Sequence, residues 1–137
     1  MTQEDKELLL KDLCARLPYN VICQVEFKEN GKYNSKVMLL SGIFTDEAYF
    51  TTKGGSIYSN GYKPYLFPLS SMTEEQKQYL KNRFCYDWDG EPYDLWKCQI
   101  EIGDTDELID WFNENHFDYR GLIEKSLALD ASKLNIY

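Results

Sequence analysis

The stretch NVICQVEFKENGKYNSKVMLLSGIF, residues 20–44, decides the fold. Its first arm alternates apolar and polar side chains, which is the period-two pattern of a β-strand with one buried face. Asn30 and Gly31 follow, and this dipeptide is a strong hairpin signal because both residues tolerate a positive φ. The second arm, residues 33–44, is long enough to bend, and Gly42 is the natural place for a bulge. We therefore expect a long antiparallel hairpin.

The chain beyond this hairpin continues with short segments separated by turns. Residues 48–52 and 56–59 are expected to be strands, so four strands form a meander that can curl into a partial barrel. Residues 62–68 contain Pro64 and Pro68, and we expect this segment to be extended and irregular rather than a central strand, because proline lacks an N–H donor. Alternating patterns predict two further strands, at residues 95–102 and 127–130.

Helices are expected where apolar residues recur at spacings of three and four. A capping box begins at Thr2 and precedes a first helix over residues 3–16, which Pro18 ends. A second helix covers residues 73–84 and follows one of two capping boxes, Ser71 with Glu74 or Thr73 with Gln76.

A third helix is capped by Asp104 or Thr105, and a short helical turn at 120–125 is capped by Asp118. The resulting fold class is α+β, with a small antiparallel, barrel-like meander sheet flanked by three to four helices. The composition, with 43% hydrophobic and 15% aromatic residues, is sufficient for a core in a single domain spanning 1–137.

The charge balance disfavours nucleic acid as the main ligand. The chain has 15 basic and 23 acidic residues and a net charge of -8, which opposes a broad electrostatic contact with phosphates. A nucleic-acid-binding small barrel with exposed aromatics is kept as an alternative, and its basic cluster is Lys28, Lys32, Lys36, Lys53 and Lys63.

A cytoplasmic protein without membrane association is expected. No apolar run approaches the roughly 20 residues of a membrane span, and the first residues, MTQEDKELLLKD, are acidic where a secretory signal is basic. The four cysteines form no CxxC pair, so buried free thiols are favoured over a zinc site or disulfides. No cofactor and no metal are expected.

An acidic loop gives one enzymatic alternative. Asp87, Asp89 and Glu91 place three carboxylates within five residues and could hold a divalent cation for a metal-assisted hydrolase. The spacing does not match a calcium loop, because Gly90 directly follows the second aspartate. A solvated turn is the simpler interpretation of this loop.

A second enzymatic alternative lies in NENHFDYRGLIEKSLALDAS, residues 113–132. Here His116 could act as a general base, with Asp118 as the carboxylate that orients it. Tyr119 follows Asp118 in the sequence, and Arg120 is a candidate side chain for binding an anion. A helix start at Asp118 would separate these side chains, and no nucleophile motif or phosphate loop accompanies them. Helix capping and core packing are therefore the favoured roles, and no residue is assigned as catalytic.

The tyrosines supply the candidate partner-binding residues. The chain has 11 tyrosines, and an extended proline-bearing segment concentrates Tyr58, Tyr62, Tyr65 and Phe67. Tyrosine is favoured at interfaces because it covers a large area at low entropy cost and keeps a polar tip. The alternative is that these rings cover the small sheet.

Two segments, KPYLFPLSSMTEEQ at 63–76 and WFNENHFDYRGLIEKSLALDA at 111–131, resemble a family of small proteins encoded in gut Bacteroidales genomes, often in phage or prophage regions. The opening, residues 4–25, is also similar to this family. Where similar sequences tend to have glycine, this chain has Ser126, which weakens a left-handed helix cap there. The family has no established activity, so the resemblance implies a bacterial or infected-cell cytoplasm rather than a mechanism.

These observations together predict a non-enzymatic protein–protein interaction module, an accessory protein of a phage or mobile element with an unknown host or phage protein as its partner. The alternatives are a small hydrolase or metal-assisted enzyme, which would use His116 or the acidic loop, and the nucleic-acid-binding barrel.

Overall fold

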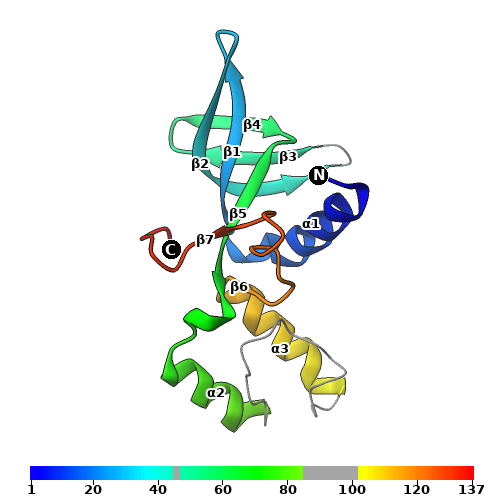
Figure 1. Cartoon of the computed structure of the whole chain (residues 1–137), viewed down its shortest axis with the longest axis vertical. Coiled ribbons are helices and arrows are strands. Elements are labelled where there is room, and N and C mark those ends of the chain that lie inside the picture. Colours follow the sequence, from blue (N-terminus) through cyan, green and yellow to red (C-terminus); the bar gives the residue numbers. More distant parts are fainter. Residues whose placement is uncertain (45–46, 85–101) are drawn as a thin grey trace.

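The predicted hairpin is the longest strand pair of the sheet (Figure 1). β1 (Ile22–Glu29) and β2 (Lys32–Ile43) pair antiparallel along the whole length of β1. Asn30 and Gly31 turn the chain with φ values of 51° and 78°, as the sequence predicts. This arrangement is taken from a computed structural model that describes residues 1–44, 47–84 and 102–137.

The sheet extends from this hairpin on both sides. Within the described residues it has seven strands in the order β4-β3-β2-β1-β5-β6, with β7 paired to β5. The predicted four-strand meander is thus confirmed, and the β2–β3 register shifts between Leu40 and Gly42, where a bulge was expected. The other strands are β3 (Ala48–Thr52), β4 (Gly55–Ser59), β5 (Tyr62–Pro68), β6 (Phe117–Asp118) and β7 (Leu129–Asp130).

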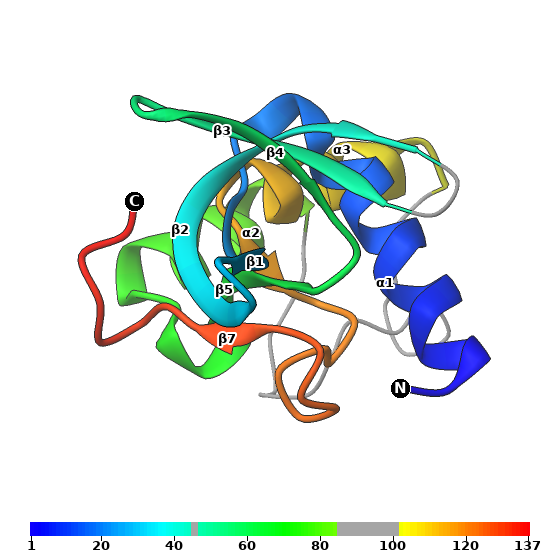
Figure 2. The same cartoon turned by 90° about the horizontal axis from the view of Figure 1, so that it is seen from above.

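The sheet is strongly curved but does not close into a barrel. Figure 2 shows β2 as an arc around β1 and β5, with β3 and β4 crossing at one end. The curvature brings the end of β4 to β1, where the Ser59 hydroxyl donates to the Glu26 carbonyl oxygen over 2.7 Å. Backbone pairing is not continued between these strands in the described part of the chain, so β4 remains an edge and the sheet stays open.

The prediction for residues 62–68 is wrong, because β5 is an interior strand. It pairs antiparallel with β1 and parallel with both β6 and β7. Opposite residues of an antiparallel pair alternate between hydrogen-bonded and non-hydrogen-bonded pairs, and Glu26 N donates to Gly61 O, so this pair is hydrogen-bonded. Three positions further along, Pro64 and Cys23 therefore form a non-hydrogen-bonded pair. Pro64 is tolerated because no N–H donor towards β1 is needed there. Pro68 ends the strand and needs no ladder donor.

Three α-helices are found among the described residues: α1 (Gln3–Arg16), α2 (Glu74–Phe84) and α3 (Ile102–Glu114). The Thr2 capping box is formed, and the second helix uses the Thr73 box, with Gln76 N donating to the Thr73 hydroxyl over 3.1 Å. Single-turn 3-10 helices follow α1 at Leu17–Tyr19 and precede α2 at Leu69–Ser71.

Two boundary predictions need correction. α3 begins at Ile102, two residues before the first predicted cap, whereas a strand was expected up to this residue. The segment at 120–125 forms turns rather than a helix, although Asp118 does accept from backbone N–H groups there. The remainder of the predicted strand, residues 95–101, lies outside the described residues.

Two clusters of buried side chains hold the elements together. The first lies between α1 and the curved sheet and includes Leu13, Val25 and Phe50. The second lies between α2, α3 and β6 and includes Leu80 and Phe112. β5 runs from the first group of elements to the second (Figure 1).

Candidate functional site

Three aromatic side chains, which we call the aromatic patch, gather on the outer face of the sheet: Phe44, Tyr49 and Tyr58. Tyr49 and Tyr58 are direct partners across β3 and β4, with ring centroids 4.9 Å apart, and the ring of Phe44 lies 5.5 Å from that of Tyr58. The Phe44 ring packs over Gly42, where a Cβ would lie 3.5 Å from it, an ordinary van der Waals contact. Phe44 is 54% exposed and Tyr58 is 56% exposed, so the patch presents aromatic surface to solvent.

A groove adjoins the patch between α1 and the connections at the end of the sheet. It has a volume of about 630 Å³ and shares Phe44 with the aromatic patch. Leu10 and Met1 contribute apolar surface, and they are 38% and 66% exposed. The polar lining includes one cation and two carboxylates, from Lys6, Glu7 and Glu47. Patch and groove therefore form one continuous surface of mixed apolar and polar character.

The four predicted partner-binding residues do not share one surface. Tyr58 belongs to the aromatic patch, and Tyr62 lines the groove while its ring contacts Phe50 at 5.2 Å. Burial raises the pKa of Tyr62. Tyr65 is only 7% exposed, and Phe67 packs between the rings of Phe117 and Tyr137.

Sequence reasoning missed Phe44 and Tyr49 as surface residues. A signal was available at Tyr49, because it lies between Ala48 and Phe50, which are buried, so strand alternation directs its ring outward. No comparable signal existed for Phe44, whose position depends on the bulge at the end of β2.

His116 lies two residues after the end of α3 and has a left-handed conformation, with φ of 61°. Its ring stacks on that of Tyr137 with a centroid distance of 3.7 Å and an interplanar angle of 13°. Burial, with a further contribution from the positive charge of Arg16, lowers the pKa of His116 to about 4. The imidazole is therefore neutral at pH 7, and its buried Nδ1 has no hydrogen-bond partner in the described structure.

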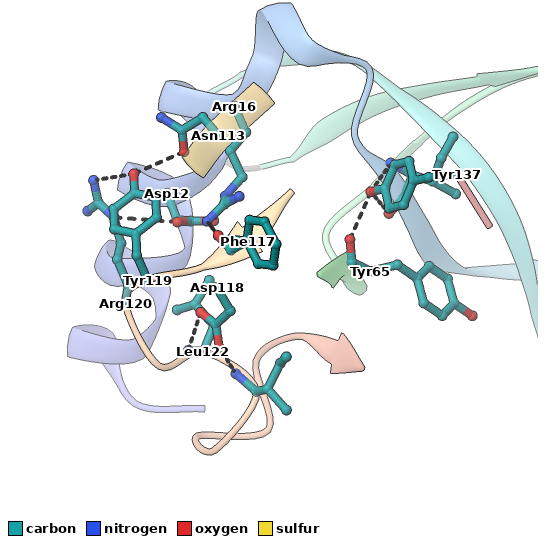
Figure 3. A network of polar contacts seen from close by, with 12 residues as sticks. Asp12, Arg16, Tyr65, Asn113, Phe117, Asp118, Tyr119, Arg120, Leu122 and Tyr137 are labelled. Atoms are coloured by element: carbon teal, nitrogen blue, oxygen red, sulfur yellow. Dashed lines mark hydrogen bonds and ion pairs between the residues drawn. The ribbon is translucent and has the colours of Figure 1, made fainter. Parts of the chain in front are cut away.

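Asp118 has a capping role. Its Oδ1 accepts from Leu122 N over 2.8 Å and its Oδ2 accepts from Ile123 N over 2.9 Å (Figure 3). Burial raises the pKa of Asp118, while these two backbone bonds act in the opposite direction. Both carboxylate oxygens are therefore used to hold the chain reversal after β6.

A buried ion pair within α1 is connected to β6 by a further hydrogen bond of its arginine. Arg16 Nε donates to Asp12 Oδ2 over 2.7 Å, and both side chains are fully buried. Arg16 also donates from a terminal nitrogen to the Phe117 carbonyl oxygen over 2.6 Å. Arg120 Nε lies 3.4 Å from the second oxygen of Asp12, which gives this carboxylate two cationic neighbours (Figure 3).

Tyr119 completes this network. Its hydroxyl donates to Asn113 Oδ1 over 3.0 Å, and the guanidinium carbons of Arg16 and Arg120 lie 5.1 and 5.2 Å from its ring centroid. His116 thus contacts Tyr137, and Asp118 contacts backbone N–H groups. Arg120 contacts Asp12, so the three residues take part in three separate sets of interactions.

No group of three His, Cys, Asp or Glu side chains suited to a metal ion is found in the described ranges. The loop with Asp87, Asp89 and Glu91 lies outside them, as do Cys85 and Cys98. Among the other cysteines, Cys23 is a buried free thiol as predicted, and its burial raises its pKa, whereas Cys14 is exposed.

The lysines of the predicted basic cluster are divided between the two faces of the sheet. Lys28 is opposite Tyr33 and Lys63 is opposite Gln24 on one face. Lys36 is opposite the buried Val25 on the other face, and Lys32 shares that face. Lys53 lies in the turn between β3 and β4.

Comparisons with protein-family models, with curated proteins and with solved structures found no match to this chain. None of the helices in the described ranges has the length and apolar character required to cross a bilayer.

Proposed function

We propose that this chain is a non-enzymatic protein-binding module that docks its partner on the aromatic patch and the adjoining groove. The observation that carries the proposal is the exposure of Phe44 and Tyr58 next to a groove of about 630 Å³. Following the family resemblance, we place this activity in an accessory protein of Bacteroidales or their phages, acting on a host or phage protein in the cytoplasm.

The energetics of aromatic residues support this assignment. An aromatic side chain buries about 150–250 Å² on contact, and truncating an aromatic hot-spot residue costs about 2 kcal/mol or more. Tyr49 supports Tyr58 from the neighbouring strand, so both rings are held by the sheet before any partner arrives. A preorganised surface loses less entropy on binding.

The two other classes of function have weaker support. Nucleic-acid binding would need a basic face, but Lys28 and Lys36 point to opposite faces and the net charge is -8. Catalysis through His116 would need a free ring edge and a pKa near the working pH, whereas its pKa is about 4 and its Nδ1 is buried.

Affinity capture tests the proposal with a matched pair of surface variants. The tagged chain is incubated with Bacteroidales lysates, from infected and uninfected cells, with and without nuclease. We expect one protein to be retained in stoichiometric amount and to survive nuclease. The double substitution Phe44→Ser and Tyr58→Ser should weaken its binding by roughly thirtyfold or more, the equivalent of about 2 kcal/mol.

The control substitutes Tyr33→Ser and Val37→Ser, two other exposed side chains on the hairpin, at 80% and 46% exposure. This variant should bind like the wild type. Equal capture by both variants, or a partner released by nuclease, would contradict the proposal. Circular dichroism spectra and thermal melting confirm beforehand that each variant is folded.

A further inference from the structure

The Tyr137 hydroxyl occupies a gap between two strands of the sheet. β1 and β5 pair directly as far as Cys23 with Pro64, so Ile22 and Tyr65 would form the next bonded pair. In that position Ile22 N instead donates to the Tyr137 hydroxyl over 2.9 Å, and this hydroxyl donates to the Tyr65 carbonyl oxygen over 2.8 Å. A phenol thus replaces a backbone hydrogen bond where the strands separate (Figure 3).

Two aromatic side chains form the walls of this gap. The ring of His116 stacks on that of Tyr137 at 3.7 Å, and the ring centroid of Phe67 lies 5.8 Å away. The walls are tied to each other, because Phe67 N donates to the His116 carbonyl oxygen over 2.8 Å. Tyr137 as a whole is 41% exposed, while burial on its side towards the strands raises the pKa of its hydroxyl, which is a donor across the physiological range as in an ordinary tyrosine.

The segment that delivers Tyr137 is held at its two ends. Ala131 N donates to the Leu66 carbonyl oxygen over 2.8 Å, and the next anchor is Tyr137 itself. The residues at 132–135 are exposed. Opening of this segment therefore breaks the Tyr137 contacts and little else, which is typical of a region that opens locally without global unfolding.

We propose that the gap between β1 and β5 is a binding site for a para-substituted phenol, the chemistry of a tyrosyl side chain, and that Tyr137 fills it in cis. An external phenol occupies the site when the segment at 132–137 moves away. This site is separate from the aromatic patch and does not depend on its function.

The hydroxyl determines the selectivity of the site. Ile22 N needs an acceptor and the Tyr65 carbonyl oxygen needs a donor, and a phenol supplies both with one atom. A benzyl group of the same shape makes neither hydrogen bond, and each lost hydrogen bond costs about 0.5–1.5 kcal/mol. We expect phenols to bind at least about tenfold more tightly than the matching ring without a hydroxyl.

The test uses the full chain with Tyr137→Ala, titrated with N-acetyltyrosinamide and, as matched control, N-acetylphenylalaninamide. NMR follows the Ile22 amide signal and its hydrogen exchange. We expect saturable binding of the tyrosine derivative, slower exchange of this amide, and at least tenfold weaker binding of the phenylalanine derivative. Wild type, with its site filled, should show no saturable shift over the same concentrations. Equal binding of the two derivatives, or no saturable shift in the variant, would overturn the proposal.

The same titration remains decisive if Tyr137→Ala does not fold alone, with circular dichroism as readout. The tyrosine derivative should then restore the folded spectrum and the phenylalanine derivative should not, whereas failure of both overturns the proposal.

p-Cresol separates the possible sources of the phenol. Equal affinity for p-cresol supports recognition of the ring alone, and weaker affinity supports recognition of a tyrosine within a peptide. Phe44→Ser with Tyr58→Ser should leave phenol binding unchanged when combined with Tyr137→Ala.

Discussion

At the scale of single residues, the buried charges of this protein are explained by pairing. Asp12 and Arg16 are fully buried, and isolated charges in such positions would cost several kcal/mol each. Their hydrogen bond, the Arg16 contact with the Phe117 carbonyl oxygen and the nearby Arg120 offset part of this cost, while Asp12 Oδ1 and one terminal nitrogen of Arg16 make no hydrogen bond in the described structure. The network specifies how α1 meets β6, since a shifted helix would break the contacts of Arg16 with the Phe117 carbonyl oxygen and of Arg120 with Asp12.

His116 predicts a pH dependence of stability. Its pKa is about 4 in the folded chain and 6.5 in a model compound, so the unfolded chain binds more protons between these values. The free energy of unfolding therefore falls as the pH decreases from 6.5 towards 4, by at most about 1.4 kcal/mol per pH unit for this one group. Above pH 6.5 the ring is neutral in both states and contributes no slope.

Urea unfolding of wild type and His116→Asn over pH 4–7 measures this effect. Asparagine tolerates the left-handed conformation and does not titrate in this range. The stability difference between the two proteins should change with pH in favour of the variant as the pH falls. Asp118 and the other carboxylates titrate in both proteins, so their contribution cancels. A difference that is constant with pH would rule out the burial of a neutral His116.

At the scale of elements, local signals were sufficient where the stabilising contacts are local. The capping boxes at Thr2 and Thr73 and the turn at Asn30 and Gly31 involve residues within four positions of each other. The Thr2 box and the turn were predicted, and the Thr73 box was one of two alternatives. The four-strand meander followed from the same kind of pattern. The aromatic patch was found only at Tyr58, because the curvature and the β2 bulge bring Phe44 beside it.

β5 could not be predicted because its neighbours come from distant parts of the chain. It pairs with β1 over residues 62–64, with β7 over 65–66 and with β6 over 67–68. Its two prolines suggest an edge strand or a loop. An interior strand is possible because Pro64 falls at a position that does not hydrogen-bond to β1 and Pro68 is the last residue of the strand. Tertiary pairing overrode the local signal here.

Ser126 allows a test of helix-like capping at the chain reversal after β6. Ser126 N donates to Ile123 O and Leu127 N donates to Leu122 O, which is the Schellman hydrogen-bond pattern, with Ser126 at φ of 60°. A side chain is disfavoured in this conformation. Ser126→Gly should therefore raise the free energy of unfolding by up to about 1 kcal/mol, measured by urea denaturation.

The control for this substitution is Ser132→Gly, at an exposed position without a positive φ. Glycine there increases the entropy of the unfolded chain, so this variant should be unchanged or slightly less stable. If Ser126→Gly lowers the free energy of unfolding by as much as Ser132→Gly does, the strain of the left-handed backbone conformation at Ser126 is negligible.

At the scale of the whole molecule, a shared strand and hydrogen bonds link the two buried clusters. β5 passes from one to the other, and Arg16 of α1, which packs with the first cluster, bonds to Phe117 of the second. The Tyr137 hydroxyl adds a link between β1 and β5. We expect the clusters to unfold in a single cooperative transition.

Leu80→Ala tests this coupling. Leu80 is fully buried in the second cluster, and its truncation should cost about 2–5 kcal/mol. If unfolding is cooperative, hydrogen exchange of the β1 amides, such as Val25 in the first cluster, should lose the same free energy of protection. Unchanged protection at Val25 with a lowered protection in α2 would show that the clusters unfold independently.

The parallel pairing of β5 has a consequence for synthesis. Roughly sixty-five residues separate Leu66 from Asp130 of β7, and at about 5–20 residues per second the ribosome needs about 3–13 s to add them. During this interval the nascent chain can already form the β1–β2 hairpin and dock β5 on β1, but the other edge of β5 has no partner. A half-finished sheet with an open edge is the kind of surface that chaperones bind and that pairs between neighbouring chains on a polysome. Expression yield should therefore depend on translation speed through the segment that follows β5.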